Sequence, residues 1–177
     1  KAITDDVGES TIEELVNAAF TMSKPKTGAL IVIERKDSLV NIEKTGILIN
    51  GIVSSQLLIN IFEHNTPLHD GAVLIRGNTI VSATCYLPLS ENMRISKDLG
   101  TRHRAAIGIS EVSDSITIVV SEETGRVSVA LGGNLIKVND SEELRKELSV
   151  LLEDTAEEKK SSLWSKLLKG RGNEKDK

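Results

Sequence analysis

The chain has 177 residues and a mass of 19.2 kDa, with 39% hydrophobic and 27% charged residues, which predicts one soluble globular domain. A net charge of −4 and an aromatic content of 2% argue against nucleic-acid binding, which favours basic surfaces and stacking rings. The lone cysteine, Cys85, excludes an internal disulfide and a multi-thiolate zinc site, and it indicates a reducing cytosol. The sequence contains no apolar run of about 18 residues that could span a membrane.

The first predicted element is a helix at residues 10–23, where apolar side chains recur at helical spacing. Ser10 and Glu13 have the spacing of a capping box at its start. A continuous, β-branched apolar run at residues 28–33 then predicts a buried strand. Two more elements are expected next: a short strand at residues 47–49 and a helix at residues 54–62.

The second half of the chain begins with a predicted hairpin, in which strands at residues 72–76 and 79–87 flank the turn Gly77-Asn78. A helix is expected from Gly100-Thr101 through Ile109, with Thr101 as its N-cap. The remaining elements are strands at residues 116–121, 126–131 and 135–138 and a helix at 141–154 capped by Asp140 and Glu143. This order predicts a mixed α/β domain.

Three parts of the chain are distinguished by composition. Residues 10–155 carry the periodic elements and form the expected domain. Residues 156–177 are rich in both charges and are expected to form a solvated tail. Residues 1–9 are expected to be a linker, and because the sequence starts at Lys1 rather than Met, we expect a fragment of a longer protein.

The sequence His69-Asp70-Gly71-Ala72 is the first candidate site. It lies where a polar loop enters a predicted buried strand. A carboxylate there can hold a divalent cation or accept a proton, the imidazole can add a metal ligand, and glycine allows close approach of a ligand. The alternative is structural, because Asp-Gly is a common turn pair.

The sequence Gly100-Thr101-Arg102-His103-Arg104 is the second candidate. Its cations fall in the first turn of the predicted helix, next to the positive end of the helix dipole, where positive charge is unfavourable. Free amides and guanidinium groups together suit a phosphate. The alternative is that the cations pair with surface acids.

Two weaker candidates lie at the ends of predicted strands. Adjacent acids in Ser121-Glu122-Glu123 suit a metal or would balance the arginines, although the same residues suit a polar turn. Tyr86 could stack on a base or could simply bury its ring and hydrate its hydroxyl. These residues alone indicate a phosphate site and a metal site in an α/β domain, without specifying a reaction.

Taken in order, these motifs resemble the diadenylate cyclase domain family, specifically its membrane-anchored type from Gram-positive bacteria. The resemblance rests on five segments: Gly28-Ala29-Leu30, Pro67 to Ala72, Cys85 to Ser90, Gly100 to Ala106 and Ser121 to Gly125. It implies a mixed, twisted central sheet flanked by helices. It also implies the condensation of two ATP molecules into cyclic di-AMP by two domains that meet face to face as a homodimer, with Mn²⁺, Mg²⁺ or Co²⁺ as cofactor.

The resemblance also implies roles for particular residues. Asp70, Gly71 and Arg102 are expected to take part in the reaction, with Asp70 activating the ribose 3′-hydroxyl through a metal or as a base. His69, Asp70 and Glu123 are the expected metal ligands. The residues expected to bind ATP are Gly71, Ala72, Tyr86, Leu87, Gly100, Thr101, Arg102, His103, Arg104, Ser121 and Glu122.

The family further implies surroundings that these residues do not identify. In the membrane-anchored type, the full-length protein lies at the cytoplasmic face of the cell membrane and this part of it is soluble. A membrane-bound regulator and phosphoglucosamine mutase are the expected protein partners, and nucleic acid is not. Two alternatives stay open: a nucleotide-sensing module without turnover, and an interaction domain that works through its charged tail.

Overall fold

The computed structural model describes residues 2–153, so the predicted tail at residues 156–177 lies outside the described part of the chain. The strands are β1 (Ala29–Ile33), β2 (Ile47–Ile52), β3 (Ala72–Arg76), β4 (Thr79–Cys85), β5 (Ile116–Val120), β6 (Val127–Leu131) and β7 (Asn134–Val138). The helices are α1 (Glu9–Ser23), α2 (Val40–Glu43), α3 (Ser55–Phe62), α4 (Thr101–Val112) and α5 (Ser141–Leu152).

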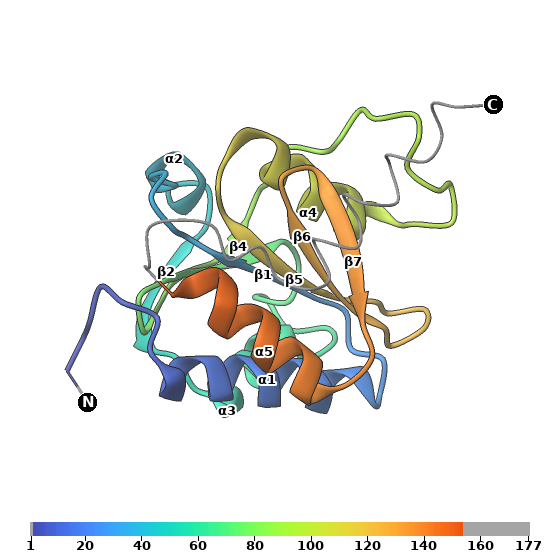
Figure 1. Ribbon diagram of the computed structural model, residues 1–177. Helices are drawn as coiled ribbons and strands as arrows, with labels where there is room; N and C mark the ends of the chain where they lie inside the picture. Colours follow the sequence, from blue (N-terminus) through green and yellow to red (C-terminus); the bar gives the residue numbers. More distant parts are fainter. Residues whose placement is uncertain (1, 154–177) are drawn as a thin grey trace.

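The strands form one sheet of seven in the order β2-β4-β3-β1-β5-β6-β7 (Figure 1). Strand β1 lies at its centre, parallel to β3 and antiparallel to β5, and all other pairs are antiparallel. All five residues of β1 are buried, as expected for a strand covered on both faces. The mixed sheet with flanking helices confirms the predicted fold class.

One face of the sheet is covered by α1, α3 and α5, which lie together below it in Figure 1. These helices bury large aliphatic and aromatic side chains against the strands, because their apolar residues recur at helical spacing. The cluster includes Leu15 and Met22 of α1, Leu58 and Phe62 of α3, and Leu148 of α5. It forms the main hydrophobic core of the domain.

The opposite face is covered by α4, and the short helix α2 lies on the same side, near the β2–β4 edge (Figure 1). The buried cluster here is smaller and contains several alanines, among them Ala72, Ala105, Ala106 and Ala130. Small side chains leave space between helix and sheet at one end, and the candidate site lies there.

The N-terminal segment contacts the turn between β3 and β4. The side chain of Asn78 donates to the carbonyl of Ala2 at 2.8 Å and accepts from the amide of Thr4 at 2.9 Å. Gly77, at φ +59°, packs so closely on the Thr4 carbonyl that a Cβ would collide with it. The predicted turn pair therefore also holds residues 2–4, which lie in the expected linker.

Several predicted boundaries are wrong in detail. Helix α1 begins at Glu9 with Gly8 as N-cap and no side-chain cap bond, so the Ser10–Glu13 capping box does not form. The N-cap of α4 is Gly100 rather than Thr101. Helix α2 was not predicted, because four residues are too few to show a period. The predicted cap of α5 is confirmed, since Asp140 accepts from the amide of Glu143 at 2.8 Å.

None of the helices within residues 2–153 is both long and apolar enough to cross a membrane.

Candidate functional site

A cavity of about 740 Å³ opens on the α4 face at one end of the sheet. It lies where β4 and β5 end and where β3 and β6 begin, beside the N-terminus of α4. Its volume is typical of small-molecule sites. The predicted site residues that line it are Asp70, Gly71, Tyr86, Leu87, Gly100, Thr101, Arg102, His103, Ser121, Glu122 and Glu123.

Three of the predicted site residues do not line this cavity. Ala72 is buried in the cluster between sheet and α4. Arg104 is two residues beyond Arg102, and two helical steps of about 100° place their side chains on different sides of α4. His69 lies beside the cavity, with its Nε2 3.3 Å from an Asp70 carboxylate oxygen.

The cavity also has walls that the sequence did not reveal. Leu30 of β1 and Leu135 of β7 supply apolar surface, and Arg126 and Lys137 add cations near β6 and β7. The available signal was the alternation of side chains along a strand. Residues two apart on a strand share a face, so this alternation could have placed Leu135 and Lys137 on one side of the sheet.

Asp70 and Gly71 are held at the rim by a close backbone contact. Gly71 has φ +77°, and a Cβ at this position would lie 2.8 Å from the carbonyl oxygen of Cys85. The position therefore requires glycine on two grounds, its backbone conformation and the space available. The Asp70 side chain is 87% exposed, so its carboxylate is accessible from outside the cavity.

His69 is oriented by its backbone neighbour. Its Nδ1 lies 2.6 Å from the carbonyl oxygen of Thr66, which assigns the Nδ1 hydrogen to that bond. In the neutral imidazole, Nε2 is then a lone-pair acceptor, and it faces an acceptor oxygen of Asp70 at 3.3 Å. Two acceptors that face one another are stabilised by a cation or by a proton between them.

A bulge in β4 turns Cys85 toward the cavity. Ala72 pairs with Cys85 but Leu74 pairs with Ser82, so β4 carries one extra residue there. Thr84 has φ +55°, a conformation that β-branched residues rarely adopt. As a result, Ala83 packs toward the α1, α3 and α5 core whereas Cys85 packs on the α4 side. Burial raises the pKa of the Cys85 thiol. The Cys85 side chain forms part of the cavity wall.

Arg102 lies against the start of β1 and pairs with an acid. A Cβ at residue 28 would lie 2.6 Å from its guanidinium carbon, so Gly28 makes room for this side chain. A terminal nitrogen of Arg102 lies 3.2 Å from a carboxylate oxygen of Glu122. The predicted pairing with an acid is therefore present for Arg102, and because Arg102 also lines the cavity, its phosphate contact stays a prediction.

His103 is a buried imidazole in the cavity wall. Burial lowers its pKa, while the nearby carboxylate of Glu123 acts in the opposite direction. The imidazole is therefore predominantly neutral at pH 7. A neutral His103 can offer a hydrogen bond to a ligand without adding charge.

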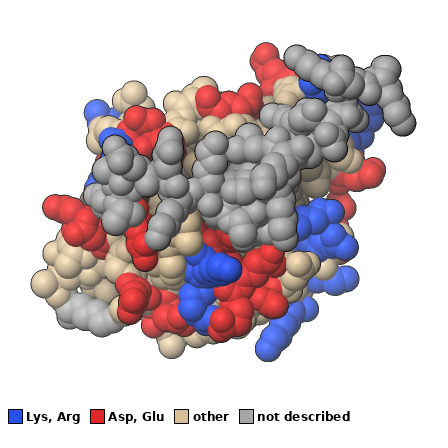
Figure 2. Space-filling model, viewed as in Figure 1, with Lys and Arg blue, Asp and Glu red and all other residues tan. Residues whose placement is uncertain are grey.

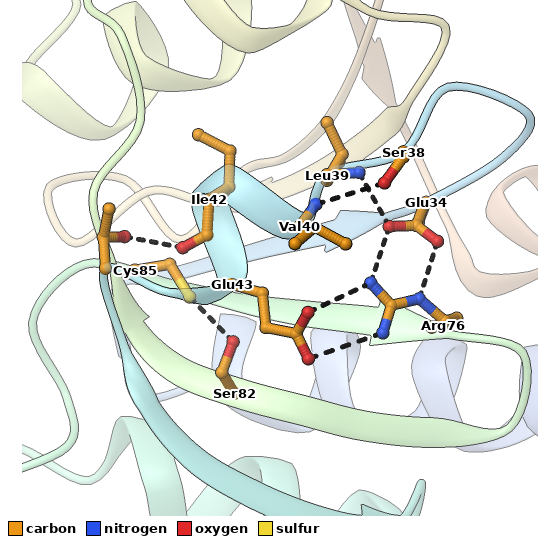
Figure 3. Close-up of polar contacts among 10 residues, drawn as sticks. Glu34, Ser38, Leu39, Val40, Ile42, Glu43, Arg76, Ser82 and Cys85 are labelled. Carbon is orange, nitrogen blue, oxygen red and sulfur yellow. Dashed lines mark hydrogen bonds and ion pairs between the residues drawn. The ribbon is translucent and has the colours of Figure 1, made fainter.

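Helix α2 is tied to the sheet through Arg76 (Figure 3) and to the cavity rim through the residue Thr45. Arg76 makes a bidentate pair with Glu34, at 2.7 and 2.9 Å, and also reaches Glu43 of α2 at 3.5 Å. Burial acts to raise the pKa of Glu34, but hydrogen bonds from Arg76 and from the Leu39 amide outweigh it and lower the pKa. Thr45, just after α2, accepts from the amide of Tyr86 at 2.9 Å. The rim at Tyr86 thus depends on α2.

The expected metal ligands do not form one cluster. Within residues 2–153, no group of three His, Cys, Asp or Glu side chains is placed to hold a metal ion. His69 and Asp70 are adjacent, and Glu123 lines the cavity separately. A metal bound here would therefore take further ligands from a substrate or from another chain.

Residues 16–135 match the family described as "DisA bacterial checkpoint controller nucleotide-binding". The chain belongs to this family. It is 51% identical over 160 residues to "Cyclic di-AMP synthase CdaA" of Bacillus subtilis, which covers 90% of this chain and 59% of that protein. It is 54% identical over 157 residues to a "Diadenylate cyclase" of Listeria monocytogenes, which covers 88% of this chain and 56% of that protein. The chain thus spans somewhat more than half the length of these relatives.

Two solved structures are similar as well. The crystal structure of a double mutant of DacA from Staphylococcus aureus aligns with a TM-score of 0.80 at 46% identity, covering 82% of this chain and 97% of that one. A "hypothetical membrane spanning protein from Bacillus cereus" aligns with a TM-score of 0.72 at 47% identity, covering 75% of this chain and 64% of that one. Both agree with the sheet and helices described above.

Proposed function

We propose that this chain is the catalytic domain of a diadenylate cyclase, a nucleotidyltransferase that converts two ATP molecules into cyclic di-AMP and two pyrophosphates. The observation that carries the proposal is one cavity that combines Asp70 and Gly71 with Arg102 and the N-terminus of α4. This combination places a carboxylate beside an anion site, which suits nucleotide transfer. The names of the relatives at 51% and 54% identity support the same reaction.

ATP is proposed to lie across the end of the sheet. Its adenine lies at Tyr86 and Leu87, where β4 ends, and its ribose and α-phosphate lie at Asp70 and Gly71, before β3. The phosphates meet the free amides of the first turn of α4 and Arg102, which exchanges Glu122 for the phosphate. Ser121 and the neutral imidazole of His103 complete the polar wall.

The reaction forms one bond and breaks one bond at each α-phosphorus. The ribose 3′-oxygen of one ATP attacks the α-phosphorus of the other, the bond to the β-phosphate bridging oxygen breaks, and pyrophosphate leaves with its electron pair. Asp70 accepts or directs the 3′-hydroxyl proton. Arg102 and the α4 amides stabilise charge on the phosphates, and the shape of the cavity supplies alignment.

The residues around Asp70 fit a divalent cation. The His69 Nε2 faces the Asp70 carboxylate, and the Thr66 carbonyl fixes the other ring nitrogen, an arrangement typical of metal-ligating histidines. His69 and Asp70 would hold the ion, with substrate phosphates as further ligands. Bound there, Mn²⁺, Mg²⁺ or Co²⁺ would neutralise phosphate charge and make the 3′-hydroxyl a better nucleophile.

A homodimer is proposed to complete the site, because ring closure needs two ATP molecules that each attack the other. Asp70 lies at the rim and is 87% exposed in the isolated chain, which suits a carboxylate that acts on a nucleotide held by a facing protomer. Tyr86, at the same rim, is 77% exposed. A monomer would bind ATP without closing the ring.

The setting of the full-length protein is proposed from its relatives. A similar structure is named as a membrane-spanning protein, and the chain matches only part of its curated relatives. This supports a membrane-anchored type with the cyclase domain at the cytoplasmic face. The membrane-bound regulator and phosphoglucosamine mutase stay predictions from the resemblance.

The test is to incubate the chain with ATP and Mn²⁺ at several protein concentrations and to measure cyclic di-AMP by mass spectrometry. We expect product, with a rate per protein molecule that rises with protein concentration, because the site needs two protomers. ATP binding without product would favour a nucleotide-sensing module. Forced dimerisation through a fused coiled coil then separates that outcome from a domain that merely dimerises weakly.

A further inference from the structure

Two basic residues without a role in the proposed reaction, Arg126 and Lys137, lie together on the cavity side of β6 and β7. Lys137 pairs in register with Ser128 across the two strands. Arg126 lies two residues before Ser128, so the three side chains share one face of the sheet. All three line the cavity. The basic groups of Arg126 and Lys137 are therefore diagonal neighbours, within reach of one another.

Diagonal neighbours with long side chains are within reach of one another, so an anion bound between two cations in this arrangement would relieve their repulsion. Within residues 2–153, neither Arg126 nor Lys137 forms an ion pair with an acid, whereas Arg102 pairs with Glu122. Both residues are exposed and line the cavity. Their placement favours an anionic ligand with more than one charge.

The strand order gives the position of this pair along the nucleotide. From β4, the sheet runs through β3, β1 and β5 to β6 and β7. Neighbouring strands are about 4.8 Å apart, so β6 lies roughly 14 Å from β3 and roughly 19 Å from β4. With adenine at the end of β4 and the α-phosphate at the start of β3, a triphosphate that continues in this direction points toward β6 and β7, and the long side chains of Arg126 and Lys137 would cover the remaining distance.

We propose that Arg126 and Lys137 bind the β- and γ-phosphates of ATP and hold the pyrophosphate as it leaves. The proposal rests on the proposed cyclase function and assigns contacts to residues outside the predicted site. Arg102 and the α4 amides then contact the proximal phosphates, and Arg126 and Lys137 replace Arg104 as the second basic group. Positive charge there stabilises the leaving group in the transition state.

The test compares ligands that differ only in the distal phosphates. Dissociation constants for ATP, AMP and inorganic pyrophosphate are measured by calorimetry for wild type, Arg126→Gln and Lys137→Gln. Each variant should bind ATP and pyrophosphate about tenfold more weakly, with AMP affinity changed less than about twofold. Lys137→Arg keeps the positive charge and should bind ATP with the affinity of wild type. The matched control is Lys146→Gln, on the exposed side of α5, which should bind all three ligands like wild type.

The outcomes separate this inference from the proposed function. If wild type binds ATP and forms cyclic di-AMP but both glutamine variants bind ATP with unchanged affinity, this inference alone is overturned. Equal weakening of ATP and AMP would also overturn it, because that indicates a general structural effect. If wild type neither binds ATP nor forms product, the cyclase proposal itself is contradicted, and this inference falls with it. Thermal unfolding of each variant confirms that the folded state is being compared.

Discussion

The two faces of the central sheet are packed with different kinds of residue. The face under α1, α3 and α5 buries large side chains such as Leu15, Leu58 and Phe62. The face under α4 buries a smaller cluster that includes several alanines, among them Ala72 and Ala106, and it opens into a cavity of about 740 Å³. Large buried side chains supply most of the hydrophobic stabilisation, while small ones leave volume for a ligand. The comparison indicates that stability and chemistry are divided between the faces.

The same contrast extends to charge. Figure 2 shows acidic side chains gathered over α1 and α5, with basic ones between them. In the same pair of helices, Arg145 of α5 pairs with Glu13 of α1 and with Glu142. In the cavity, by contrast, Arg126 and Lys137 have no acidic partner in the described part of the chain. Arg145 on the helical face is thus compensated by acids, whereas Arg126 and Lys137 in the cavity stay available to an anionic ligand.

The largest expected effect comes from breaking the packed face. Leu58→Ala removes a fully buried side chain from α3 and should lower the free energy of unfolding by about 2–5 kcal/mol. Turnover per folded molecule should stay at the wild-type level, because Leu58 does not line the cavity. Urea denaturation and product formation at low temperature measure the two quantities.

The matched control for Leu58→Ala is Leu48→Ala on edge strand β2. Leu48 is 70% exposed, so its truncation should change stability by no more than about 0.5 kcal/mol. Equal destabilisation by the two substitutions would contradict the assignment of stability to the packed face.

A smaller stability effect and a large activity effect are expected at the cavity rim. Gly71→Ala forces a side chain into φ +77° and against the Cys85 carbonyl, which should cost about 2 kcal/mol and displace Asp70. Gly132→Ala is its counterpart, with φ +58° and no atom within 4 Å of the added Cβ. That variant should lose about 1 kcal/mol and keep its activity. Similar activity in both variants would argue against positioning by Gly71.

The smallest expected effect concerns the link between α2 and the sheet. Arg76→Gln removes the partner of Glu34 and should cost about 1 kcal/mol at pH 7, because these groups are only partly buried. The pKa of Glu34 is lowered below its ordinary value of 4.5 in the folded state, so the contribution is complete above pH 4.5. It is lost as the pH falls through the folded-state pKa. The stability difference between wild type and variant should therefore shrink in acid, and a difference that grows would contradict the assignment.

Much of the fold followed from local patterns. Helical spacing predicted α1 and α3, the capping residues Asp140 and Glu143 predicted α5, and the turn Gly77-Asn78 predicted the β3–β4 hairpin. The four-residue helix α2 has no detectable period, and tertiary contacts of Arg76 with Glu34 and Glu43 hold it instead. Such contacts join residues more than 30 positions apart, and the sequence alone does not reveal them.

The site was less predictable than the fold, for identifiable reasons. Motifs located Asp70, Gly71 and Arg102 because each is short and contiguous. Arg104 was grouped with Arg102 by adjacency, although helical geometry separates them. Arg126 and Lys137 belong to the cavity through the pairing of β6 with β7, which depends on strand register.

The division of stability and chemistry between the two faces is tested most directly by Asp70→Asn, measured for unfolding and for turnover on the same sample. Asp70 is 87% exposed, so the free energy of unfolding should stay within about 0.5 kcal/mol of wild type. Cyclic di-AMP formation should fall at least about 100-fold while ATP still binds, because the carboxylate is needed for the 3′-hydroxyl. Product at the wild-type rate would contradict the central claim, and so would a loss of activity explained by unfolding.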